Sequence, residues 1–236
     1  MGRCSSPDLF RSTLRIAILA ATLGFMTAQP AGAADVVAPV LQAGDTWTYR
    51  HIDGYNKLDV GTVSSVVEAA GPNEVRLATR SVNGLVNFES TYAGPGQLAS
   101  GTLSERAAGA MHPPLQLTRY PLREGERWVQ NVVRDDVMSR EKRETEMRVR
   151  VIGWETVKVP AGEFRALLIE RAFELGDYDP FRGPTLRYER EWYAPEVKGP
   201  VKLEVFEEYF ESRYSRLGLP APGTRATYEL LSYKVG

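Results

Sequence analysis

The segment MRVRV at residues 147–151 decides the fold class, because apolar and basic side chains alternate along it. Successive side chains of a β-strand point to opposite faces, so a period of two buries one set and leaves the other in water. Residues 75–80 and 201–205 alternate in the same way. Turn-forming residues lie between such runs, in GPN at 71–73 and PAG at 160–162. The sequence therefore predicts strands joined by tight turns.

Helical spacing is scarce after residue 44. The best candidate is 103–111, where Ser104 would cap a short turn before Pro113 and Pro114 end it. Residues 201–214 also admit a helix, although the first five of them favour a strand. The predicted fold class is mainly β, an antiparallel curved sheet or open barrel-like sheet with little helix.

The first 33 residues have the features of a secretory signal peptide. Arginines precede an apolar run at 16–26 that is too short to span a bilayer, and AGA at 31–33 suits a signal peptidase. We expect cleavage between Ala33 and Ala34, and a periplasmic or secreted protein without a transmembrane segment. No cysteine follows the apolar run and no arginine pair precedes it, so neither a lipoprotein anchor nor twin-arginine export is indicated.

A weak internal repeat suggests two related β units. GDTW at 44–47 matches GERW at 125–128, and ESTYAGP at 89–95 resembles EWYAP at 191–195, in the same order. Such units cannot each bury a face well alone, so we expect them to share one sheet or to pack together. A chance match is the alternative. The predicted organisation is a cleaved signal peptide, a mobile lead-in, a first β unit with its link, and a second β unit, at residues 1–33, 34–43, 44–120 and 121–236.

Composition excludes several classes of function. A net charge of −1 at pH 7 gives the chain no positive field that would attract nucleic acid or an anionic membrane. The one cysteine, Cys4, lies in the predicted signal peptide, so the mature chain has no disulfide and lacks the usual thiolate ligands of zinc or iron–sulfur sites. We expect no nucleic-acid partner, no metal and no cofactor.

Catalytic motifs are missing as well. The two histidines, His51 and His112, lie beside turn residues, without a Gly-x-Ser-x-Gly elbow or His-Glu-x-x-His spacing. Acidic pairs at 135–136, 177/179 and 207–208 are interpreted as turn residues rather than acid–base or calcium sites. Residues 134–150 hold six basic and five acidic side chains, which predicts a solvated hairpin face with cross-strand pairs. We expect no catalytic residue.

Two segments of the second half resemble a known family. They are VKVPAGEFRA at 157–166 and WYAPEVKGPVK at 192–202, and YPLREGERW at 120–128 fits the entry into the same unit. They resemble the TapB-like exported bacterial proteins of unknown function, over about residues 118–210. The residues on either side of Gly199, Lys198 and Pro200, are a departure from the family's pattern, which is less strict at these positions. The resemblance implies a secreted or periplasmic β-sheet domain with no assigned activity and no catalytic residues to carry over.

Aromatic side chains on predicted strands are the remaining positive feature. Trp47, Trp128, Trp192 and Tyr193 are the candidate ligand contacts, although filling a core is their simpler role. The leading hypothesis is an exported non-enzymatic envelope protein that binds an apolar small molecule or lipid, or an envelope partner protein. Two alternatives stay open: a carboxylate-dependent hydrolase acting on envelope polysaccharide, and a structural or assembly module acting through a sheet edge.

Overall fold

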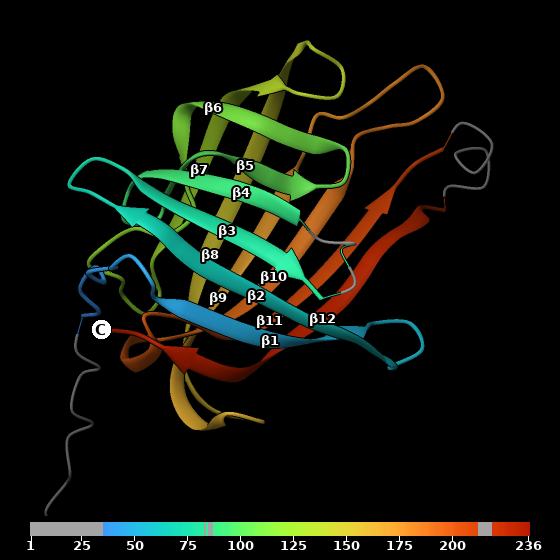
Figure 1. The fold of residues 1–236 in the computed structure, drawn as a ribbon. Coiled ribbons are helices and arrows are strands. Elements are labelled where there is room, and N and C mark those ends of the chain that lie inside the picture. The colour runs from blue at the N-terminus through green and yellow to red at the C-terminus, as the bar shows by residue number, and fades with distance from the viewer. Residues whose placement is uncertain (1–34, 83, 85–86, 212–218) are drawn as a thin grey trace, which may run out of the picture. The chain divides into compact units, whose positions relative to one another are not determined.

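The computed structural model describes residues 35–82, 84, 87–211 and 219–236, so the predicted signal peptide and its cleavage site lie outside the described residues. Within this part of the chain, twelve strands form one closed antiparallel barrel. Each strand pairs with its sequence neighbours, and β1 pairs with β12 (Figure 1). The strands are β1 (Thr46–Asp53), β2 (Asp59–Ala70), β3 (Val75–Ser81), β4 (Asn87–Gly94), β5 (Gln97–Ser104), β6 (Ala107–Gln116), β7 (Arg127–Asp136), β8 (Lys142–Val159), β9 (Gly162–Glu174), β10 (Leu186–Ala194), β11 (Gly199–Tyr209) and β12 (Ala221–Lys234), with one 3-10 turn, η1 (Pro195–Val197).

The predicted mainly β class is confirmed, and the sheet is closed rather than open. The segment at 147–151 lies in β8, and the PAG turn joins β8 to β9. Gly162 in that turn has a φ of 143°, a backbone conformation that favours glycine.

The helix predicted at 103–111 is wrong, because these residues form the end of β5, a two-residue turn and the start of β6. Leu103, Ala107 and Met111 are buried at intervals of four residues. An interval of four fits both the helical and the strand period, so long-range pairing decides between them. The strand alternative is confirmed for residues 201–209, which lie in β11.

The two matching Gly-acid-x-Trp segments hold equivalent places in the barrel. The first exchanges two backbone hydrogen bonds with Val67 of β2, and the second exchanges two with Val151 of β8, all at 2.8–2.9 Å. β1 and β7 follow these segments. β4 and β10, which carry the other matching pair, are likewise six strands apart. This spacing is what a duplicated six-strand unit would produce, and the duplication stays a prediction.

The two ends of the barrel differ in their packing. Antiparallel order places the β2–β3, β4–β5, β6–β7, β8–β9 and β10–β11 turns at one end, called the base, and the other connections at the opposite end, called the mouth. At the base the β8–β9 turn contacts β12, because the Ala161 N–H donates to the Leu230 carbonyl at 2.9 Å and Phe164 meets Tyr233 edge-on at 6.2 Å. Phe164 and Leu230 belong to a buried apolar cluster that fills this end.

The end of the chain is fixed beside the first strand. Asp45 is buried, and its carboxylate accepts hydrogen bonds from the Gln42 and Gly236 N–H groups at 2.9 Å each. Lys198 donates to the Val40 carbonyl at 2.7 Å and also to the Gly236 carbonyl. These contacts hold the last residue where the barrel closes.

A glutamine completes the pairing between β6 and β7. The backbone ladder there covers four residue pairs and stops before Pro113 and Pro114, which have no N–H to donate. Gln130 bridges the gap, because its Oε1 accepts from the Gln116 N–H at 2.7 Å and its Nε2 donates to the Pro114 carbonyl at 3.0 Å. Trp128 Nε1 adds a bond to the Gln116 carbonyl at 2.9 Å. Side chains therefore close the barrel where proline interrupts the ladder.

Replacing Gln130 with alanine leaves the Gln116 N–H and the Pro114 carbonyl without these partners. We expect Gln130→Ala to lower the free energy of unfolding by about 2 kcal/mol, the usual cost of partly buried polar groups left unsatisfied. Urea denaturation measures the change. The control is Val129→Ala at the exposed neighbour on the same strand, expected to stay within about 0.5 kcal/mol of the unmodified protein. Equal losses in the two variants would contradict the bridging role.

Candidate functional site

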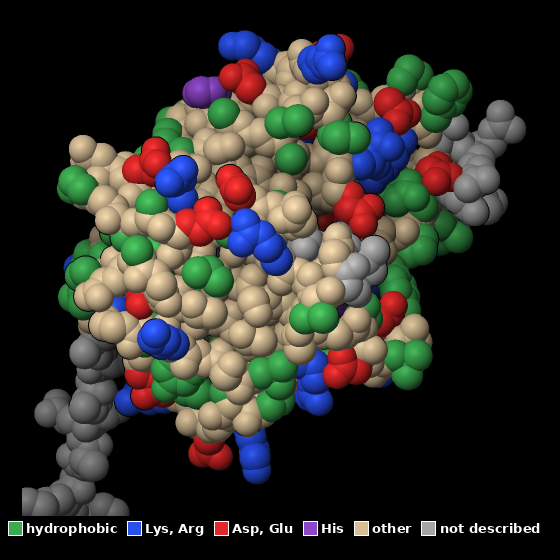
Figure 2. Space-filling view, in the orientation of Figure 1, with side chains coloured by type: hydrophobic (Ala, Val, Ile, Leu, Met, Phe, Trp, Pro, Cys, Tyr) green, Lys and Arg blue, Asp and Glu red, His purple; other side chains and the backbone are tan. Residues whose placement is uncertain are grey.

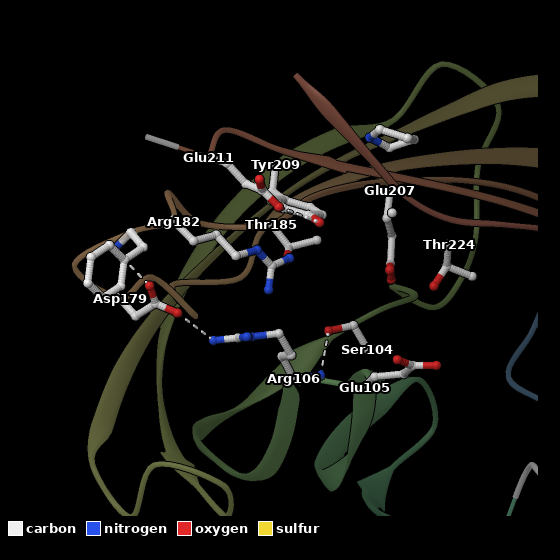
Figure 3. Close-up of a pocket in the computed structure, with 13 residues that line it drawn as sticks. Ser104, Glu105, Arg106, Asp179, Arg182, Thr185, Glu207, Tyr209, Glu211 and Thr224 are labelled. Carbon is white, nitrogen blue, oxygen red and sulfur yellow. Dashed lines mark hydrogen bonds and ion pairs between the residues drawn. The ribbon is translucent and has the colours of Figure 1, made fainter. Parts of the chain in front are cut away.

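A cavity of about 750 Å³ opens at the mouth of the barrel (Figure 3). It lies between the β5–β6 turn, the β9–β10 loop, and the ends of β11 and β12. In the ring of twelve strands β5 and β11 are six strands apart, so the cavity spans the opening from one wall to the opposite wall. The lining residues are Ser104, Glu105, Arg106, Asp179, Phe181, Arg182, Thr185, Glu207, Tyr209, Glu211, Pro222, Gly223 and Thr224.

The β9–β10 loop is held in place by its own hydrogen bonds. Gly176 begins the loop with a φ of 62°, and a Cβ there would lie 1.9 Å from the Glu144 carbonyl oxygen, so only glycine fits. The buried Asp177 carboxylate accepts from the N–H and the hydroxyl of Thr185, both at 2.6 Å. These side-chain bonds fix the loop beside the cavity.

Two guanidinium groups line the cavity from different elements. Arg106 forms an ion pair with Asp179 at 2.9 Å, marked in Figure 3. The Arg182 Cζ lies 3.7 Å from the centroid of the Tyr209 ring, and its Nη2 donates to the Thr185 hydroxyl at 2.7 Å. The buried Nε of Arg182 has no hydrogen-bond partner among the described residues. The guanidinium of Arg182 also lies 3.6 Å from an Asp177 oxygen, so its charge is paired inside the loop.

Carboxylates line the same cavity, so both signs of charge are present. The backbone N–H of Phe181 and the Arg106 guanidinium hold the pKa of Asp179 below its ordinary value, which keeps this carboxylate ionised. Glu105, Glu207 and Glu211 also line the opening.

Glu207 connects the cavity to a series of buried charges inside the barrel. It accepts from Arg187 Nη1 at 2.6 Å, and Arg187 Nε donates to Glu189 at 2.8 Å. Arg171 Nη1 lies 3.4 Å from a Glu189 oxygen and 2.7 Å from a Glu191 oxygen. We call these five residues the interior charge ladder. It crosses β9, β10 and β11, and none of its side chains is more than 15% exposed.

The charges of the ladder stabilise one another against burial. Burial opposes the charged form of Arg171, but Glu191 and Glu189 outweigh it and raise the pKa of Arg171. Burial likewise opposes ionisation of Glu189, but Arg187 and Arg171 hold the pKa of Glu189 below its ordinary value. Arg171 also donates to the Leu117 carbonyl at 2.9 Å. Each of these charges therefore has a partner inside the barrel.

The four predicted ligand contacts lie in the core. Trp47, Trp128, Trp192 and Tyr193 are each at most 5% exposed, and none of them lines the mouth cavity. Trp47 and Trp192 share one buried cluster, and Trp128 and Tyr193 share another. Each indole N–H donates to another residue of the chain at 2.7–2.9 Å: Trp47 and Trp128 to backbone carbonyls, and Trp192 to the carboxylate of the exposed Glu155. Their role as ligand contacts stays a prediction.

The acidic pairs occupy two kinds of position. Asp177 accepts a backbone N–H in the β9–β10 loop, as predicted. Asp135 and Asp136 lie at the end of β7, so the turn interpretation holds there only in that Asp136 accepts the Met138 N–H of the following turn. The turn interpretation of 207–208 is wrong, since both glutamates lie on β11, and the pairing of Glu207 with Arg187 explains its burial. The predicted solvated face is also wrong at Arg134, which is fully buried because it pairs with Asp136 at 3.0 Å and donates to Thr145.

The histidines lie away from the cavity lining. His51 stacks on Tyr228 with ring centroids 4.7 Å apart, and burial lowers the pKa of His51. His112 contacts Asp135 at 2.9 Å on the surface. Among the described residues, no group of three or more His, Cys, Asp or Glu side chains is arranged to hold a metal ion. No helix in the described chain is long and apolar enough to cross a membrane.

Sequence reasoning missed the ladder and the cavity. Arg187, Glu189 and Glu191 do alternate along β10, which indicates one shared face. Charged side chains ordinarily indicate the solvent face, so the alternation alone places them on the wrong side. No short stretch of sequence indicates the cavity, because the residues that line it are spread along the chain from Ser104 to Thr224.

Comparisons with known proteins give structural neighbours only. No family model matches the chain, and no curated protein matches it. A protein from Bacteroides fragilis NCTC 9343, described as exported and with a YmcC-like fold, has a TM-score of 0.45 and 14% identity over 84% of this chain and 99% of its own. A protein from Parabacteroides distasonis ATCC 8503, described as a lipoprotein, has a TM-score of 0.44 and 15% identity over 85% of this chain and 100% of its own. The hypothetical lipoprotein YmcC from Escherichia coli K12 has a TM-score of 0.39 and 9% identity over 86% of this chain and 92% of its own.

Neutralising Glu189 removes one carboxylate shared by two buried arginines. We expect Glu189→Gln to lower the free energy of unfolding at neutral pH by about 3 kcal/mol, because breaking a buried pair leaves charge uncompensated. The control is Glu204→Gln on β11, in a more exposed pair with Arg190, expected to cost less than about 1 kcal/mol. Urea denaturation at several pH values measures both.

The pH dependence gives a second check on Glu189. Its pKa is lowered in the folded state, so its contribution is present above the ordinary glutamate pKa of about 4.3 and is lost as pH falls below it. The difference between the unmodified protein and Glu189→Gln should therefore shrink on acidification. A difference independent of pH would contradict the ionised state of Glu189.

Proposed function

We propose that this protein is an exported envelope protein that binds the charged head group of an amphiphilic ligand in the mouth cavity. One observation carries the proposal: an opening of about 750 Å³ presents guanidinium and carboxylate groups together. This volume lies in the range of small-molecule sites, which runs from about 300 to 1,000 Å³. The signal-like N-terminus supports export.

The chemistry of the lining favours a zwitterionic head group. Arg106 and Arg182 offer planar forks of N–H donors that suit phosphate or carboxylate oxygens. Glu105, Glu207 and Glu211 line the same space and suit an ammonium group. A wholly apolar ligand would displace water from these charges without replacing its hydrogen bonds, which is unfavourable. We therefore replace the hypothesis of a wholly apolar ligand with that of an amphiphile whose charged head group enters the cavity.

The two alternatives have less support. A polysaccharide hydrolase needs a carboxylic acid with a raised pKa as general acid, and Asp179, whose pKa is lowered, does not suit that role. A module acting through a sheet edge needs an unpaired strand, whereas every described strand has a partner on both sides in the closed ring.

The binding site can be tested with one arginine on the cavity and one on the wall. Lysophosphatidylethanolamine is the probe, and native mass spectrometry of the purified protein measures its binding. We expect Arg106→Gln to weaken binding about tenfold, the effect of losing one charge-assisted hydrogen bond. The control is Arg80→Gln, because Arg80 is 55% exposed, against 51% for Arg106, and also takes part in an ion pair, with Glu68. Arg106 pairs with Asp179 and, at 4.0 Å, with Asp177.

The same measurement shows whether the purified protein already carries a ligand. A non-covalent extra mass that Arg106→Gln reduces and Arg80→Gln retains is the expected result. Absence of both a co-purified mass and probe binding would overturn the proposal. So would equal binding by the two variants.

A further inference from the structure

Exposed apolar side chains gather at the mouth end of the barrel. Five of the mouth connections carry large hydrophobic side chains that are more than half exposed. Two of these are tyrosines, Tyr55 and Tyr178, and we call the other six the apolar crown: Leu58, Val82, Val137, Met138, Phe181 and Leu219. The five turns at the base, all within the described residues, carry no exposed large hydrophobic side chain. The segment before β1 at the same end carries two, Val37 and Val40. The β9–β10 loop at the upper right of Figure 1 coincides with hydrophobic side chains at the same place in Figure 2.

The pattern of polarity at the mouth is the reverse of a protein–protein interface. Protein interfaces have an apolar centre depleted of charge and a polar rim. At this mouth the cavity in the centre is lined mostly by charged and polar groups. The connections around it carry the apolar crown, of which Phe181 also lines the cavity. Apolar groups on a surface-bound protein enter the boundary between head groups and acyl chains, while charged groups remain at the level of the head groups. A lipid surface therefore matches the mouth better than a protein partner does.

The interior below the cavity also favours a head group over a whole lipid. Glu207 lines the cavity and is paired to Arg187, so the interior charge ladder begins directly beneath it. An acyl chain entering the barrel would have to displace these paired charges, which is costly. The tail of an amphiphile bound at the mouth therefore remains outside, where the apolar crown lies.

The charge of the mouth selects the kind of lipid. Attraction to anionic membranes depends on clusters of Lys and Arg. The cavity instead combines Arg106 and Arg182 with several carboxylates, and the whole chain has a net charge of −1. This mixture complements a head group with one phosphate and one ammonium.

From these observations we propose that the mouth end docks on a bilayer of zwitterionic lipid, with the apolar crown in the interface and one head group in the cavity. The identity of the cavity occupant rests on the proposed function, whereas docking by the crown does not. The crown and the cavity are therefore tested by separate variants.

Flotation with vesicles of phosphatidylethanolamine and phosphatidylcholine tests the docking. We expect the protein to float with these vesicles, and to do so in about 1 M salt, because apolar insertion is not screened. The variant Val137→Ser/Met138→Ser changes two crown residues that do not line the mouth cavity, at 66% and 72% exposure. It should lower the partition coefficient at least about tenfold, since each side chain loses apolar area buried in the interface.

The matched control lies at the opposite end of the barrel. Val37→Ser/Val40→Ser changes two valines before β1 that are 75% and 74% exposed, and it should leave flotation unchanged. Failure of the unmodified protein to float, or equal loss in both double variants, would overturn the docking. Capture of an envelope protein by the crown without vesicle binding would also overturn it. Vesicle binding that survives Arg106→Gln, with no probe in the cavity, would retain the docking and reject the proposed function.

Discussion

The buried charges of the interior ladder must stay paired, and this requirement fixes the strands around them. A shift of β10 by one residue would turn Arg187, Glu189 and Glu191 outward and bring Arg190 inward, because side chains alternate between the two faces. Arg171, whose side chain is only 3% exposed, would then lose both of its carboxylates and leave a buried charge uncompensated. The register of β9, β10 and β11 therefore has one favourable solution. That solution also sets where the β9–β10 loop and Glu207 reach the mouth.

Local patterns in the sequence predicted the strands well and the closure poorly. The alternation at 147–151 and the PAG turn at 160–162 depend only on neighbouring residues, and both predictions are confirmed. The pairing of β1 with β12 joins residues separated by most of the chain, so no short window contains it. The segment at 103–111 is the best helix candidate by its possible Ser104 cap and the prolines after it, but these are local signals, and its partners across the sheet decide for a strand.

The candidate site was less predictable than the fold, for two physical reasons. Burial of Arg171 and Glu207 contradicts the general preference of charged side chains for water, and it becomes favourable only when each finds its partner on another strand. The mouth cavity depends on the circumference of the ring, because it forms between β5 and β11 on opposite walls. The tryptophans, by contrast, were visible in the sequence, but large aromatic side chains serve a core as readily as a ligand.

The bonds that fix Gly236 beside Asp45 have a consequence for how the barrel opens. Chain termini normally fray first, because few contacts hold them. In this ring the last strand is also the neighbour of the first, so peeling β12 away exposes β1 and breaks a second ladder at the same time. Opening from an end is therefore no easier than opening from the middle. The barrel should therefore become accessible to proteases as a whole, by rare global unfolding, and not strand by strand from the β1–β12 seam.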